Sequence, residues 1–283
     1  MTEFDPEVSA KPKGPLAAFF ISGWSNLVRL MASNALFIVF NIPALIPAGF
    51  LSMEFVPWIA PHFIDVNSYI DPVTGNDQGV LQLYFFLVFF LMTFLLSCAL
   101  ICIGPFQAGF AQVYKDIYND NSVSFFSSFK TGLRNNWKKG LLSMIIGIVL
   151  TPVLLLAIGF YLNFKSGVGT IIAVVFIVLL FALVLIQNFV YTLMVSTDLK
   201  LSKIYKNALL FILLRFGPCL GISLVVIVFF VIIPFFLLMS ASYLTLGIFM
   251  FLYSFLVISW VQYFISFYTS RLIRRYVALS EEG

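Results

Sequence analysis

The stretch IGPFQAGFAQVYKDIYND, residues 103–120, decides how the middle of this chain folds. More than twenty nearly uncharged apolar residues precede it, and it contains one lysine and two aspartates. Pro105 cannot donate a backbone hydrogen bond and disfavours helix at Gly104, so we expect the chain to change direction at this pair. A new helix is expected over 106–119, in which Gly109 permits close contact with a neighbouring helix.

The composition of the whole chain indicates a membrane protein. Hydrophobic residues make up 61% of the 283 residues and charged residues 10%, and the mean hydropathy is +1.05. Soluble domains are about 45–50% apolar and about 25% charged. A chain of this length cannot bury so much apolar surface in its own core, so lipid has to cover part of it. The expected fold class is all-α, a polytopic membrane protein with six transmembrane helices and two cytoplasmic amphipathic helices.

Six apolar stretches are long enough to cross about 30 Å of hydrocarbon, which takes about 20 residues. We expect these spans at 28–51, 80–103, 140–162, 168–195, 217–240 and 243–269. They form a transmembrane domain over 27–276, preceded by an N-terminal segment over 1–26 and followed by a tail over 277–283.

The distribution of basic residues predicts the orientation. With six spans, 15 of the 16 Lys and Arg residues fall on one side, and Lys165 alone falls on the other. The loop 52–79 contains four acidic residues and no Lys or Arg. Basic residues close to span ends favour the cytoplasmic side. We therefore expect both termini in the cytoplasm and the loop 52–79 outside.

Residues 122–139 have the pattern of an amphipathic helix. At 100° per residue, an apolar face lies beside a basic face. The apolar face contains Phe126, Phe129, Leu133 and Trp137, and the basic face contains Lys130, Arg134 and Lys138. Such a helix can lie in the headgroup layer with its cations on anionic lipid headgroups. It can equally pack on the cytoplasmic end of the bundle with its cations in solvent, and the two interpretations are compatible.

The second basic loop, 198–215, has the same design. Lys200 and Lys203 share one face with Asn207, and apolar residues occupy another. We expect these cations, together with Trp137 and the cations of the first helix, to form an interface for lipid or for a protein partner.

Uncharged polar residues inside the spans are the candidates for a polar cavity, and Asn41, Gln187 and Asn188 lead them. Gln187 and Asn188 are adjacent, so they point in different directions. Hydrogen bonds between helices are the alternative role for such residues. The small-residue pairs Ser143–Gly147 and Gly217–Gly221 are expected to make helix contacts within the chain.

No enzyme motif is present, so we expect no catalytic residue, no metal site and no cofactor. His62 is the single histidine, and the three cysteines read as small buried hydrophobic residues. The positions of the basic residues are explained by the orientation of the spans and by contact with anionic lipid. We therefore expect no nucleic-acid binding.

Three stretches resemble the YesL-like family of bacterial integral membrane proteins, a domain of unknown function. They are GPLAAFF…NALFIVFNIPALI within 14–46, GPFQAGFAQVYKDIYND at 104–120 and SFFSSFKTGLRNNWKKG at 124–140. The resemblance implies a bacterial cytoplasmic membrane protein, often associated with carbohydrate-uptake systems, and it supplies no catalytic residues.

Two functions are expected from these features. The first is a non-enzymatic accessory or interaction partner of a membrane transport complex, with carbohydrate uptake as the implied process. The alternative is a small-molecule permease or channel that uses uncharged polar groups.

Overall fold

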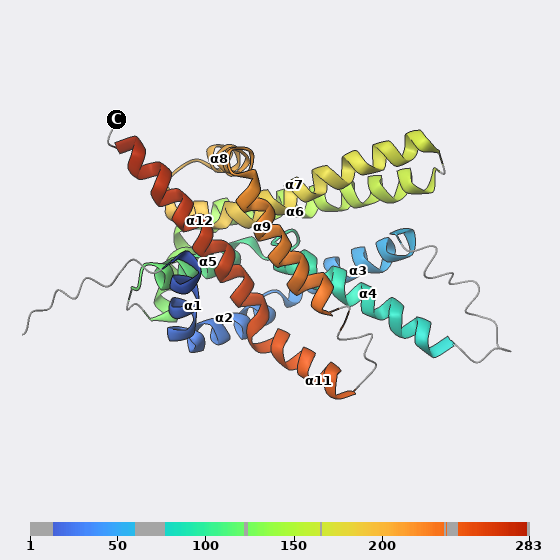
Figure 1. The fold of residues 1–283 in the computed structure, drawn as a ribbon, viewed down its shortest axis with the longest axis horizontal. Coiled ribbons are helices and arrows are strands. Elements are labelled where there is room, and N and C mark those ends of the chain that lie inside the picture. The colour runs from blue at the N-terminus through green and yellow to red at the C-terminus, as the bar shows by residue number, and fades with distance from the viewer. Residues whose placement is uncertain are drawn as a thin grey trace, which may run out of the picture.

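The computed structural model describes residues 14–59, 77–121, 124–164, 166–234, 236 and 243–281, and these residues are almost entirely helical, with no strand among them (Figure 1). The helices, in chain order, are α1 (Pro15–Ser25), α2 (Leu27–Phe40), α3 (Ile42–Ile59), α4 (Asp77–Ser97), α5 (Gly104–Tyr118), α6 (Phe125–Asn163), α7 (Gly167–Ser196), α8 (Leu201–Leu214), α9 (Phe216–Ile227), the π-helix η1 (Val228–Ile232), α11 (Tyr243–Leu252), the π-helix η2 (Tyr253–Val257) and α12 (Ile258–Glu281). The all-α fold class is confirmed for the described residues.

The helix α5 lies at the centre of the molecule, packed against α6, α7 and α12. A new helix does begin in this region, but the break comes earlier than predicted: α4 ends at Ser97, six residues before the end of the predicted span 80–103, and Gly104 and Pro105 are the first two residues of α5. The helix α5 runs antiparallel to the first half of α6, because Gly104 meets Gly140 whereas Gly109 meets Phe129. A Cβ on Gly109 would lie 2.7 Å from the Phe129 ring, so the close contact expected at this glycine is confirmed.

A buried, non-helical segment, residues 98–103, joins α4 to α5. The amide of Ala99 donates to Leu96 O at 3.1 Å and that of Leu100 to Leu95 O at 3.0 Å, the bonding of a Schellman motif. Ala99 takes the left-handed position with φ 54°, where glycine is the usual residue. The chain therefore leaves α4 through a strained turn that has no contact with solvent.

The Asn41 side chain bonds both this segment and the end of α2. Its Oδ1 accepts from Ile103 N at 2.8 Å, and its Nδ2 donates to Phe37 O at 2.9 Å. Buried backbone groups away from water need such partners, and side chains provide them where a helix is interrupted.

The helix α6 is a single helix of 39 residues. Residues 125–139 of the stretch predicted as an amphipathic helix, 122–139, and the predicted span 140–162 are thus parts of one helix, of about 58 Å, whereas residues 122 and 123 lie outside the described residues. Small residues of α6 face α5 and the buried segment. A Cβ on Gly132 would lie 2.7 Å from Ala108 O, and one on Gly147 would lie 2.2 Å from Leu100 O.

Three helices are long and apolar enough to cross a membrane: Phe125–Asn163, Gly167–Ser196 and Gly247–Arg274. Two bent pairs raise the number to five if each is one span. The first, Leu27–Phe40 with Ile42–Pro57, bends by 68°, and the second, Leu201–Leu214 with Phe216–Phe230, bends by 100°. The first bend falls at Asn41, inside the predicted span 28–51, just before Pro43. The described residues thus give three to five candidate spans.

The helices α6 and α7 form a long hairpin that projects from the bundle toward the same side as α3 and α4 (Figure 1). Large apolar side chains are exposed on both, among them Ile145, Val149, Val153, Phe160, Val168, Ile171, Val174 and Val178. Exposed apolar surface of this extent requires lipid. The chain is a membrane protein on this evidence.

Two expectations about loops and glycines differ from the structure. The ends of the predicted outer loop 52–79 are helical, because α3 continues to Ile59 and α4 begins at Asp77; residues 60–76 and Lys165 lie outside the described residues. The contact predicted for Gly217 and Gly221 is wrong, since a Cβ on either would meet nothing within 4 Å. Both lie on an exposed side of α9.

The two π-helices meet one another, and Asn34 of α2 braces one of them. Asn34 Nδ2 donates to Tyr253 O at 2.7 Å, and its Oδ1 accepts from Ser259 N at 2.8 Å. Tyr253 OH donates to Phe229 O of η1. The Asn34 amide thus bonds one backbone carbonyl of η2 and one backbone N–H in the first turn of α12.

Candidate functional site

The ends of α2, α5 and α12 meet at a turn after α5. Arg29 Nη1 donates to Asn121 O at 3.2 Å, and Arg274 Nη2 donates to Asn119 Oδ1 at 2.6 Å. The Arg274 guanidinium also lies 4.7 Å from the centre of the Tyr118 ring. Cations far apart in sequence are thus brought to one end of the molecule, here called the basic end.

Lys115 of α5 forms a hydrogen bond that connects the C-terminus of α7 to the basic end. Its Nζ donates to Val195 O at 2.7 Å, one residue before the last residue of α7. A cation at a helix C-terminus satisfies a terminal carbonyl and interacts favourably with the helix dipole. The neighbouring Asp116 carboxylate is buried and accepts from Gln112 Nε2 at 3.2 Å and Asn121 Nδ2 at 3.0 Å.

The predicted basic face of residues 122–139 is exposed at the basic end. Lys130, Arg134 and Lys138 are all exposed on the first half of α6. Lys138 Nζ lies 5.6 Å from the centre of the Trp137 ring. These three cations, called here the cation stripe, are available to lipid or a partner.

The predicted apolar face of the same helix is divided. Phe129 is 8% exposed because α5 covers it, whereas Phe126 is 70% and Trp137 51% exposed. The helix therefore packs on the bundle through part of this face and presents two aromatic side chains beside the cation stripe. The burial of Phe129 against α5 agrees with the interpretation that this stretch packs on the bundle, and contact of its cations with lipid headgroups stays a prediction.

The helix α8 carries the second predicted group. Lys200, at its N-cap, and Lys203 are exposed. Ile204 and Ala208 are buried beneath the helix, which packs on α7. The 100° bend after α8 turns it across the direction of α9.

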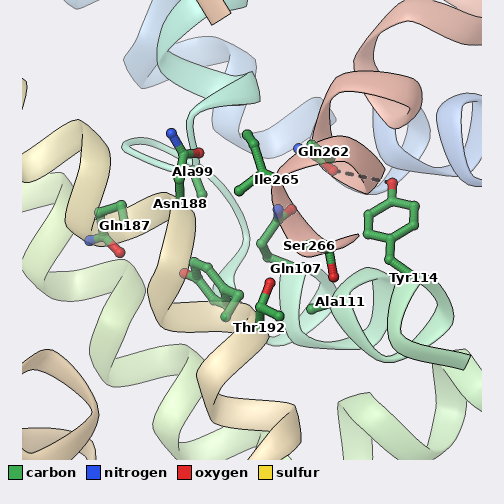
Figure 2. Close-up of a pocket in the computed structure, with 11 residues that line it drawn as sticks. Ala99, Gln107, Ala111, Tyr114, Gln187, Asn188, Thr192, Gln262, Ile265 and Ser266 are labelled. Atoms are coloured by element: carbon green, nitrogen blue, oxygen red, sulfur yellow. Dashed lines mark hydrogen bonds between the residues drawn. The ribbon is translucent and has the colours of Figure 1, made fainter. Parts of the chain in front are cut away.

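A small polar cavity lies between α5, α7 and α12 (Figure 2). It is lined by Ala99, Gln107, Ala111, Tyr114, Gln187, Asn188, Tyr191, Thr192, Gln262, Ile265 and Ser266. Three of its polar atoms are buried without a hydrogen-bond partner among the described residues: Gln107 Oε1, Asn188 Nδ2 and Ser266 Oγ. Tyr114 OH, by contrast, donates to Gln262 Oε1 at 3.3 Å.

Gln187 and Asn188 point in different directions, as their adjacency predicted (Figure 2). The Gln187 amide is bonded between α6 and α8: its Oε1 accepts from Ser143 Oγ at 3.1 Å and from Tyr205 OH at 3.4 Å. Asn188 Nδ2 has no such bond. Asn41, the third predicted cavity residue, is not among the lining residues and bonds the backbone instead.

Sequence reasoning missed Gln107 and Ser266. A spacing of four residues could have indicated part of the cavity. It places Asn188 and Thr192 on one face of their helix, and Gln262 and Ser266 on one face of theirs. Gln107 has no such partner in sequence, and only the packing of α5 brings it to the same place.

One family model matches the chain. Residues 82–160 match the family described as "Protein of unknown function, DUF624". The match runs from α4 through the buried segment and α5 to most of α6. Neither the curated proteins nor the solved structures contain a match to this chain. Within the described part of the chain, no three His, Cys, Asp or Glu side chains gather where they could hold a metal ion.

Proposed function

Because this chain carries a DUF624 domain over residues 82–160, as YesL-like proteins do, we propose that it is a non-enzymatic accessory subunit of a membrane transport complex. The membrane-embedded helices anchor it, and the basic end makes the contact with the complex. The associations of YesL-like proteins point to carbohydrate uptake as the process that it serves.

The cation stripe on α6 is the observation that carries this proposal. Lys130, Arg134 and Lys138 are exposed on the same continuous helix whose second half is apolar and exposed. Trp137 lies where the two halves join, as aromatic residues do at membrane interfaces. Lys130 is seven residues before Trp137, which places it about 10 Å further from the hydrocarbon. The stripe therefore reaches through the headgroup layer, where a membrane partner or an anionic lipid can meet it.

The proposed topology has six crossings with both termini in the cytoplasm of a bacterium. The three to five candidate spans support it, together with α4, whose 21 residues extend over about 31 Å. The convergence of Arg29, Lys115 and Arg274 at one end also supports it, because basic residues favour the cytoplasmic side.

The test is extraction of the tagged chain from its own membrane with mild detergent, followed by identification of membrane transport subunits that remain bound. Changing Lys130, Arg134 and Lys138 together to Gln is expected to release these subunits and to weaken contact with anionic bilayers. Each cation near an anionic surface contributes about 1 kcal/mol, so the loss approaches about 3 kcal/mol.

A matched control lies on the neighbouring exposed positions of α6. Ser127, Thr131 and Asn135 have the same spacing of four and are also exposed. Their joint change to Ala should leave the association intact. Equal retention of transport subunits by both triple variants would overturn the role of the cation stripe.

A permease or channel is the second candidate, and the buried segment 98–103 favours it. Non-helical backbone at membrane depth occurs where it is buried in protein or lines a cavity, and here Ala99 lines the polar cavity. Purified chain in liposomes, with sugars supplied under an imposed pH gradient, separates the two functions. Concentrative uptake that stops when the gradient collapses would replace the accessory proposal with a transport function.

A further inference from the structure

The polar cavity between α5, α7 and α12 contains atoms that the fold leaves unsatisfied. Gln107 is 7% and Ser266 2% exposed, so water outside the molecule cannot serve them. Gln107 Oε1, Ser266 Oγ and Asn188 Nδ2 have no partner in the described residues. Buried polar atoms nearly always have a hydrogen-bond partner, in protein or in bound solvent. Three exceptions around one cavity indicate an occupant.

The size of the cavity limits that occupant. The room inside it for the centre of a water molecule is about 20 Å³. A site of about 10–15 Å³ by this measure holds one water if polar partners are present. A whole sugar or polyol does not fit, but one hydroxyl group does.

The chemistry of the lining determines the class of ligand. The eleven lining residues include no Asp, Glu, Lys, Arg or His, and an ion without a counter-charge is costly to bury. Gln107 Oε1 accepts a hydrogen bond, and Asn188 Nδ2 donates one. An occupant that serves Gln107 Oε1 and Ser266 Oγ must donate a hydrogen bond, which a hydroxyl does and a simple anion or metal cation does not.

We propose that this cavity, lined by Gln107, Asn188 and Ser266, is a binding site for a neutral hydroxyl that one enclosed water molecule supplies. The bound hydroxyl links α5, α7 and α12 beside the strained turn at Ala99. The proposal is independent of the basic end, so failure of the accessory role would leave it standing.

The first test removes one of the three partners. Ser266→Ala in the full chain, in lipid nanodiscs, should lower the midpoint of thermal unfolding by about 2–4 °C, because a bound hydroxyl loses a hydrogen bond. In a dry cavity the same change removes an unsatisfied polar atom and should raise the midpoint. Ser52→Ala is the matched control, since Ser52 is buried and donates to Ala48 O of its own helix at 2.7 Å. A midpoint for Ser266→Ala equal to or above that of Ser52→Ala overturns the proposal.

The second test locates the hydroxyl and distinguishes its sources. A high-resolution structure without polyol should contain an ordered oxygen within hydrogen-bonding distance of Gln107 Oε1 and of Asn188 Nδ2 or Ser266 Oγ. Its presence in buffer alone identifies water. Its appearance only with added glycerol would overturn the assignment of the site to water. An empty cavity under both conditions overturns the site.

Discussion

The contact between α5 and α6 predicts a large effect of one methyl group. In Gly104→Ala, the new Cβ would lie 2.0 Å from Gly140 O and 2.9 Å from Met144 Cβ. Ordinary van der Waals contacts of a Cβ atom lie at 3.4–4 Å. The atom in the way belongs to the backbone of a continuous helix, so it cannot rotate aside as a side chain would.

The cost follows from the separation that the two helices must adopt. Moving α5 from α6 by about 1 Å forfeits about a quarter to a half of the dispersion energy between facing groups. Overpacking of a core costs about 1–3 kcal/mol and occasionally more. We expect the upper part of this range, about 3 kcal/mol, because α5 is buried on several sides and has no open space to move into.

Gly221→Ala is the matched change, since its Cβ meets nothing within 4 Å. Alanine is favoured over glycine inside a helix by about 0.5–1 kcal/mol, so this variant should be slightly more stable than the wild type. The buried thiols of Cys98, Cys102 and Cys219 provide the assay, because a thiol-reactive dye reaches them only on unfolding. A Gly104→Ala variant as stable as Gly221→Ala would show that the helices do not pack in this way.

Three further outcomes are expected. Asn34→Leu should destabilise the protein by about 2 kcal/mol or more, since two buried backbone groups, in η2 and α12, lose their partner, each worth about 1–3 kcal/mol; unfolding in detergent measures it. Ala99→Gly should stabilise the protein by about 0.5–1 kcal/mol in the same assay. The change relieves left-handed backbone strain of about 1–2 kcal/mol. It also raises the conformational entropy of the unfolded chain, which costs only about 0.4–1 kcal/mol. A cysteine at Asn121, which is exposed, should escape an impermeant reagent in intact cells whereas one at Asn76 is labelled, and the reverse pattern would invert the proposed orientation.

The start of a new helix close to Gly104-Pro105 and the contact at Gly109 were predictable because backbone chemistry is local, although the break itself lies just before the pair, at residues 98–103. A proline limits its own torsion and that of the preceding residue in any surroundings. The divergence of Gln187 and Asn188 followed in the same way from helix geometry. These features need no knowledge of what lies across from them.

The cavity itself could not be predicted, because it depends on three helices meeting. Gln107 belongs to a stretch with one lysine and two aspartates, and its sequence surroundings suggest a helix near water. Packing by α6, α7 and α12 buries it instead. The break at Asn41 shows the same limit, because the partner of the Asn41 side chain is Ile103, 62 residues away.

Because α6 is one continuous helix, its length fixes the distance between the cation stripe and the bilayer. The number of residues between the cation stripe and Gly140 sets both the height of the cations above the bilayer and the direction in which they face. Adding one residue after Lys139 would swing the stripe by about 100° and lift it about 1.5 Å. Adding seven would bring the stripe back to within about 20° of its original direction, about 10 Å further from the lipid. An insertion can therefore move the cation stripe further from the bilayer and keep its direction only if it adds about two full turns of helix, or a multiple of two.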